Sequence, residues 1–217
     1  MLVEKYFKET ESAKKTCYIT AWAGLAILTL MAVAVRQPLL YDEPIYLQTV
    51  ETLRQYGFSF SFLNNLEAPA GPLYAILHSS LAPITGLDVP GVRLVNITLL
   101  GLTILITIGI GYLINLTFPV LWGLCMVSIP MTWVLSGMAL TEMPAVFFMI
   151  LGFFLLIWST SHLQSKDGRE INEKNTTRSI SAKQILAAIL GGLALGIAIA
   201  GRQPLLVTLA AVPILAI

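Results

Sequence analysis

The chain has 217 residues, of which 56% are hydrophobic and 12% are charged, and its mean hydropathy of +0.80 lies well above that of a soluble domain. The net charge is only +1, and the charges lie in short stretches between long apolar segments, so the chain offers no basic surface for nucleic acid. We therefore expect an all-α membrane protein, a polytopic bundle of about five to six transmembrane helices.

The N-terminal segment, residues 1–16, mixes lysines with glutamates, and we expect it to be a cytoplasmic lead-in. Residues 18–35 then carry no charge, and at ~1.5 Å per residue they nearly cross a ~30 Å hydrocarbon core, which predicts a first transmembrane helix. Ala32-Val33-Ala34 resembles a signal-peptidase site, but the long apolar run and the acidic leader favour a retained helix. Pro38, shortly after Arg36, would end it.

Residues 36–91 form the longest predicted non-spanning region, which we expect on the external side. From Pro44 to Tyr56, apolar and polar residues alternate at helical spacing, which predicts an amphipathic helix on the membrane surface that ends at Gly57. Its apolar face would comprise Ile45, Leu47, Val50 and Leu53. Prolines and a glycine then predict a turn that presents Glu67, and Leu73–Leu81 is typical of a short apolar helix that cannot span.

Further spanning helices are predicted at 92–114, 118–137, 143–158 and 185–200, with another starting at Leu205. The polar loop between two of them, residues 161–183, is rich in lysine and arginine, which marks the cytoplasmic side. An even number of predicted helices separates this loop from the N-terminus, so both would lie inside. Residues 1–217 would form a single transmembrane domain. We expect it to be the N-terminal portion of a longer protein, because the last apolar run is too short to span.

One predicted helix carries small residues at a spacing of four. This stripe predicts close helix packing, with a dimer face as the alternative, and it comprises Ala188, Gly192, Gly196 and Ala200.

The predicted topology gathers ionisable residues at the external face. They include Arg36, Asp42, Glu43, Glu67, His78, Arg93, Glu142 and Arg202. Glu142 and Arg202 interrupt apolar sequence, and a charge at membrane depth is unfavourable unless it is paired or solvated. Either residue alone could be an interfacial anchor, but together with Asp42 and Glu43 they indicate a site. His78 is the weakest candidate, since a single histidine is more often interfacial.

Three segments carry a family resemblance: Asp42-Glu43-x-x-Tyr46, then Glu67-x-Pro69-x-Gly71-Pro72-Leu73-Tyr74, then Gly91-Val92-Arg93. Their order is similar to the first external loop of the GT-C glycosyltransferases, the class of the protein O-mannosyltransferases and of the bacterial aminoarabinose transferase of lipid A. Two later segments also look like positions of that class, Thr141-Glu142-Met143-Pro144 and Arg202-Gln203-Pro204. The second is similar to the Arg-Gln of the dolichyl-phosphoglucose-dependent transferases.

The resemblance implies transfer of a sugar from a polyprenyl-phosphate donor to an acceptor on the external or luminal face, by an inverting displacement and without a cofactor. Asp42 matches the class's general base, and its neighbour Glu43 would orient Arg93 or Arg202. A guanidinium would stabilise the leaving phosphate, with Arg202 our first choice and Arg93 the second. Glu67 corresponds to a glutamate that helps to hold a divalent metal in bacterial relatives. The chain has no Asp-x-Asp and no evident histidine partner on a later loop, so we predict no required metal.

We therefore predict catalytic roles for Asp42 and Glu43, and substrate binding by Glu67, Arg93, Glu142 and Arg202. The alternative is a non-catalytic membrane protein, a transporter fragment or assembly subunit, in which the same residues form a structural charge cluster. Transporters usually place such residues nearer the bilayer midplane, so their positions at helix ends favour the enzyme.

The sequence leaves open the sugar, the acceptor (protein, glycan or lipid), the membrane (bacterial inner membrane or ER) and the need for a second polypeptide. Membrane lipid is an expected partner.

Overall fold

The computed structural model describes residues 42–66, 71–138, 140–164 and 181–205, together with Leu39 and scattered residues between 15 and 30. Every regular element in these ranges is a helix. Three of the helices are long and apolar enough to cross a membrane, over Gly91–Leu113, Glu142–Thr160 and Ala182–Gly201. The prediction of an all-α membrane protein is thus confirmed, whereas the number of spans stays a prediction.

Several predicted features lie wholly or partly outside the described residues. They are the polar lead-in, Glu67, most of the 161–183 loop and the apolar run after Leu205. Within the predicted first helix, the residues that the structure describes are helical, up to Leu30.

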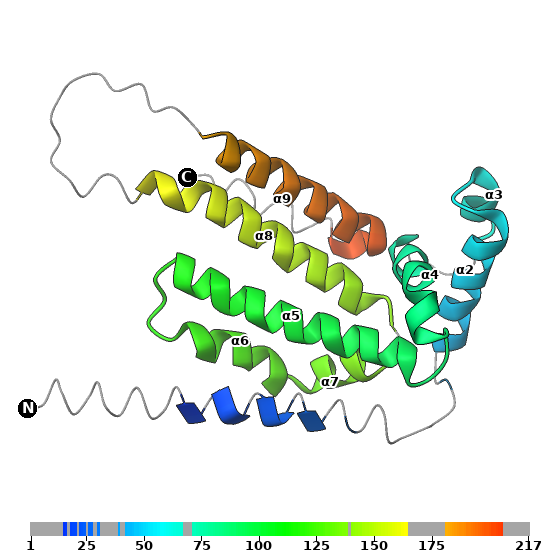
Figure 1. Cartoon of the computed structure of the whole chain (residues 1–217), viewed down its shortest axis with the longest axis horizontal. Helices are drawn as coiled ribbons and strands as arrows, with labels where there is room; N and C mark the ends of the chain where they lie inside the picture. Colours follow the sequence, from blue (N-terminus) through cyan, green and yellow to red (C-terminus); the bar gives the residue numbers. More distant parts are fainter. Residues whose placement is uncertain are drawn as a thin grey trace, which may run out of the picture.

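The centre of the molecule is a stack of three helices, α5 (Gly91–Leu113), α8 (Glu142–Gln164) and α9 (Ala182–Gly201). They lie side by side in Figure 1, with α8 between the other two. The α8–α9 contact is close because a Cβ atom added to Gly152 would lie 2.7 Å from Leu195 Cγ. Small buried residues make the α9 side of this contact, namely Ala187, Gly191, Ala194 and Ala198.

The predicted small-residue stripe does not pack on α8. Among the residues that the structure describes, a Cβ atom on Gly192 or Gly196 would meet nothing within 4 Å, so these two glycines face away from α8. Small residues occur on more than one face of α9, and sequence spacing alone selected the outward one.

The predicted helix 118–137 is two helices, α6 (Pro119–Ser128) and α7 (Pro130–Gly137). Ile129 between them is extended, with φ −82° and ψ 115°. A residue before proline is driven out of the α region by the proline ring, so Pro130 ends α6 and begins α7. The broken pair packs along α5 (Figure 1).

Three shorter helices gather beyond one end of the stack: α2 (Glu43–Tyr56), α3 (Phe60–Asn64) and α4 (Leu73–Thr85) (Figure 1). Gly57 ends α2 as predicted, with φ 63° and its N–H donating to Leu53 O at 2.8 Å. The short apolar helix is confirmed as α4, which continues four residues past Leu81 to a left-handed Gly86.

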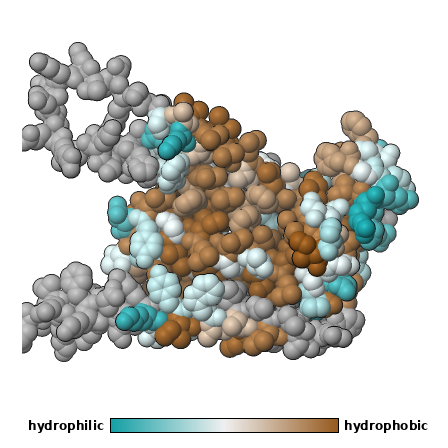
Figure 2. Space-filling model, in the orientation of Figure 1, coloured by the Kyte–Doolittle hydropathy of each residue, from teal (hydrophilic) through white to brown (hydrophobic). Residues whose placement is uncertain are grey.

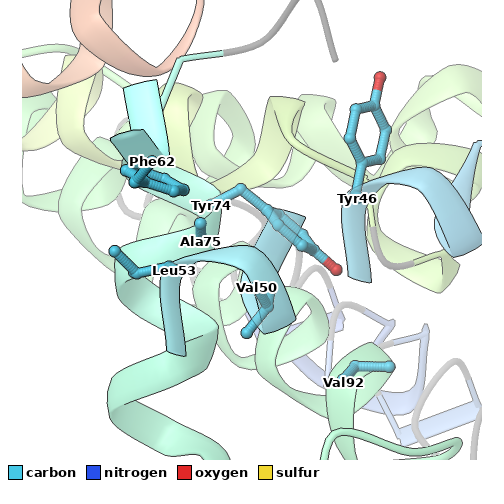
Figure 3. Close-up of a cluster of buried hydrophobic side chains, with 7 residues drawn as sticks. All are labelled: Tyr46, Val50, Leu53, Phe62, Tyr74, Ala75 and Val92. Carbon is cyan, nitrogen blue, oxygen red and sulfur yellow. The ribbon is translucent and has the colours of Figure 1, made fainter. Parts of the chain in front are cut away.

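Helix α2 is amphipathic as predicted, but its apolar face packs on protein. A buried cluster joins it to α3, α4 and α5 (Figure 3), and comprises Tyr46, Val50, Leu53, Phe62, Tyr74, Ala75 and Val92. Ile45, which we expected on that face, is 43% exposed. Its place is taken by Tyr46, whose ring lies 5.7 Å from that of Tyr74 on α4.

The distribution of hydrophobic and hydrophilic residues over the surface matches this arrangement of helices. In Figure 2 the visible surface over α5, α8 and α9 is mainly hydrophobic, and hydrophilic residues gather over α2 at one end of the stack. Large exposed apolar side chains on the stack include Leu102, Leu105, Ile189 and Leu193. An apolar belt with polar ends is the pattern that a bilayer selects.

Candidate active site

The innermost charges form a buried ion pair between the first turn of α2 and the first turn of α5. Arg93 Nε donates to Glu43 Oε1 at 2.9 Å, and Arg93 Nη2 donates to Glu43 Oε2 at 2.7 Å. The Glu43 side chain is fully buried and that of Arg93 is 5% exposed. This is the bidentate fork that a guanidinium makes with a carboxylate. We predicted that Glu43 would orient Arg93 or Arg202, and in the structure it pairs with Arg93.

A second ion pair joins Arg202, directly after α9, to Glu142 at the start of α8. Both side chains are about a quarter exposed. The Thr141 hydroxyl contacts the Glu142 carboxylate at 3.5 Å. This pair is therefore open on one side, unlike the pair between α2 and α5.

The start of α4 connects the two pairs. On one side the Tyr74 ring contacts Tyr46 of α2, three residues after Glu43 (Figure 3). On the other side Gly71 N–H donates to Gly201 O at 3.3 Å, next to Arg202. This approach requires glycine at position 71, since a Cβ there would overlap the backbone carbonyl of Ala200, and a Cβ on Gly201 would push the Leu73 side chain aside, at 2.6 Å from its Cδ2. The predicted charges from four distant segments thus meet at one end of the molecule.

Asp42 occupies the N-cap position of α2 and is exposed. Its carboxylate makes no capping hydrogen bond, although aspartate commonly caps at this position. Within the described residues, no ion pair of Asp42 is found either. The carboxylate therefore lies next to the buried Glu43 yet is free to accept a proton or a hydrogen bond.

Two buried polar side chains of α4 lie against each other, and the first of them is close enough to Glu43 to feel its charge. Tyr74 and His78 on α4 are fully buried, with ring centroids 4.2 Å apart. The Tyr74 hydroxyl and both His78 nitrogens have no hydrogen-bond partner within the described part of the chain. Burial lowers the pKa of His78 to about 4, so its ring is neutral at pH 7. Burial, and then the nearby Glu43 carboxylate, raise the pKa of Tyr74.

Asn96, one turn after Arg93 on α5, also belongs to this end of the molecule, although no role in the site was predicted for it. Its amide Nδ2 donates to Met138 O at 2.7 Å and to Leu140 O at 3.0 Å, which holds the connection between α7 and α8 against α5. The connection then leads directly into Glu142. A polar residue three positions after Arg93 in an otherwise apolar helix was the available signal.

No metal centre is formed by the residues that the structure describes, where no group of three or more His, Cys, Asp or Glu side chains is suited to hold an ion. Glu67 is outside these residues. The arrangement offers an exposed carboxylate, a closed ion pair and an open ion pair at one end of an apolar stack, which suits proton transfer and the binding of an anionic group at the membrane surface.

One family model, described as "Dolichyl-phosphate-mannose-protein mannosyltransferase", matches residues 77–217, well over half of the chain. Arg93, Glu142 and Arg202 lie inside the matched range, whereas Asp42 and Glu43 precede it. No curated protein and no solved structure matches the chain.

Proposed function

Since the chain belongs to the dolichyl-phosphate-mannose-protein mannosyltransferase family, a family of membrane glycosyltransferases, we propose that it transfers mannose from a polyprenyl-phosphate donor to a hydroxyl of a protein acceptor. The reaction would occur at the end of the stack that carries α2, α3 and α4, which we assign to the external or luminal side. The observation that carries this proposal is the family match, together with the exposed carboxylate of Asp42 at the end of the stack that also holds the ion pairs of Arg93 and Arg202.

The proposed reaction is a single inverting displacement. The acceptor oxygen attacks the anomeric carbon, the bond from that carbon to the phosphate oxygen breaks, and the bonding pair leaves with the lipid phosphate. Asp42 takes the proton of the acceptor hydroxyl as the new bond forms. Its exposure and lack of a capping bond support this role, because a general base must be able to reach the proton that it removes.

Arg202 would stabilise the charge that develops on the leaving phosphate. A guanidinium has five N–H donors, so Arg202 can keep Glu142 and still offer donors to a phosphate. The partial exposure of this pair supports access for the donor. Arg93 is less suited to contact the donor, because Glu43 already engages its Nε and Nη2 in a buried pair. We assign Glu43 and Arg93 to holding the N-terminus of α2, and hence Asp42, in position.

The test is the transfer of labelled mannose from a polyprenyl-phosphate donor to a Ser/Thr peptide in membranes that contain the chain. Asp42→Asn keeps the shape and removes the base, so we expect kcat to fall by about 10²–10⁴. Asp88→Asn makes the same change at an exposed aspartate between α4 and α5 and should leave transfer unchanged. Transfer that is indifferent to Asp42, or absent from the wild type, would exclude this mechanism and favour the non-catalytic alternative.

A further inference from the structure

A polar hollow of about 180 Å³ lies along α2, beside its buried face, and the buried Thr49 belongs to both. Its lining residues are Ile45, Gln48, Thr49, Thr52, Gln55, Tyr56 and, from the end of α3, Asn65. None of them is charged. Glu43 of this helix is buried in its pair with Arg93, and its other two charged residues, Glu51 and Arg54, form an exposed pair outside the hollow.

The hollow runs along α2 from the end that carries Asp42. Asp42, Ile45, Thr49, Thr52 and Tyr56 recur at intervals of three and four, which is the spacing of one helix face. At ~1.5 Å per residue, the lining from Ile45 to Tyr56 extends about 16 Å. A ligand that lies in the hollow would therefore have one end next to the Asp42 carboxylate.

The hydrogen-bonding groups of the hollow are largely unclaimed. The hydroxyls of Thr49 and Thr52 donate to carbonyl groups of their own helix, at 2.6 and 2.9 Å. The side chains of Gln48, Gln55 and Tyr56 make no hydrogen bond or ion pair within the described residues. Two amides and a phenol thus present both donors and acceptors to the hollow, the groups that pair with peptide N–H and C=O.

We propose that this hollow is the acceptor subsite, and that it takes an extended, uncharged polypeptide segment whose Ser or Thr hydroxyl reaches Asp42. This inference rests on the proposed function. An extended chain advances about 3.3 Å per residue, so a peptide that runs along the hollow would pass about five residues over it. Amide side chains would contact the acceptor's main chain, and an uncharged lining offers no partner for a charged acceptor side chain. Recognition would therefore tolerate many sequences that are small and neutral.

The binding test does not depend on catalysis. Membranes that contain the full chain with Gln55→p-benzoylphenylalanine are irradiated with a biotinylated neutral Ser/Thr peptide of about ten residues, and labelling of the chain is measured. The matched control places the same photoreactive residue at Glu51, which is also on α2 and exposed but lies outside the hollow. We expect labelling from position 55, removed by excess unlabelled peptide, and little labelling from position 51.

A kinetic arm separates binding from chemistry. The double variant Gln48→Ala/Gln55→Ala should raise KM for the peptide by about tenfold, with kcat and the donor KM unchanged, because two modest hydrogen bonds are lost. Glu51→Ala should change none of these constants.

Three results would overturn the acceptor subsite: equal or absent labelling at the two positions, a double variant with unchanged peptide KM, or displacement of the peptide by an oligosaccharide, which would assign the hollow to a glycan. Labelling at position 55 without sugar transfer would support the peptide site and refute the proposed function. Transfer without such labelling would leave the proposed function standing and remove the subsite.

Discussion

The buried pair between Glu43 and Arg93 makes the sharpest prediction about stability. Arg93→Ala would leave the Glu43 carboxylate fully buried and without the two donors that now hold it at 2.9 and 2.7 Å. Breaking a buried pair by removing one partner costs about 3–5 kcal/mol. The exposed pair Glu51–Arg54 is an internal control, since its side chains are 62% and 51% exposed and such pairs contribute about 0–1 kcal/mol. We therefore expect Arg93→Ala to be far more destabilising than Arg54→Ala.

The assay is the free energy of unfolding of each variant in detergent micelles, measured by denaturant titration. The double variant Glu43→Gln/Arg93→Gln removes both charges. Its loss of unfolding free energy should be smaller, by about 2 kcal/mol, than the sum of the losses for Glu43→Gln alone and Arg93→Gln alone, which is the coupling expected of contacting residues. Arg93→Lys should recover only part of the loss, because lysine cannot make the fork. If Arg93→Ala lowers the unfolding free energy no more than Arg54→Ala does, the buried pair does not stabilise the fold as its burial implies.

Three further predictions concern packing, pH and the donor phosphate. Gly152→Ala would place a Cβ 2.7 Å from Leu195 Cγ and should lower the unfolding free energy by about 1–3 kcal/mol, whereas Gly192→Ala, which meets no described atom within 4 Å, should raise it by about 0.5–1 kcal/mol through the higher helix propensity of alanine. His78 has a pKa of about 4 in the folded chain and about 6.5 when unfolded, so the unfolded state binds more protons between these values. Stability should fall by up to about 3 kcal/mol as pH drops from 6.5 to 4, and His78→Phe should flatten that pH profile. Arg202→Ala should lower kcat for sugar transfer by about 10²–10³, and Arg202→Lys, which keeps the charge without the fork, should lower it less; equal activity of all three chains would contradict a role at the phosphate.

The sequence predicted α2, its end at Gly57 and the short α4, because local patterns specify these features. It also predicted that the charges of distant segments share one end of the molecule. It could not select the partner of Glu43, since Arg93 lies 50 positions away and Arg202 was an equally reasonable choice by charge alone. Only the packing of α2 against α4 and α5 decides between them.

Other errors have local physical causes. The break between α6 and α7 follows from Pro130, which an apolar hydropathy window does not register. The face of α9 that contacts α8 depends on where Gly152 allows a close approach, and that is a property of the partner helix. The burial of Tyr74 and His78 escaped notice because both residues have amphipathic side chains that are equally common at an interface.

The difference between the two ion pairs supports a division of roles. A buried ion pair is weak evidence for stability by itself, because desolvation opposes the Coulomb attraction, so a fully buried pair next to Asp42 suggests a requirement for position. A ligand phosphate cannot use Arg93 without drawing it away from Glu43 in a low-dielectric interior, which would cost the two buried, charge-assisted hydrogen bonds between them. The Glu142–Arg202 pair is a quarter exposed, and a phosphate could join Arg202 while water or Thr141 solvates Glu142. The difference in burial therefore favours Arg93 as the residue that holds α2 in place and Arg202 as the residue that contacts the donor phosphate. Asp42, at the N-terminus of α2, is exposed to solvent and can reach the acceptor.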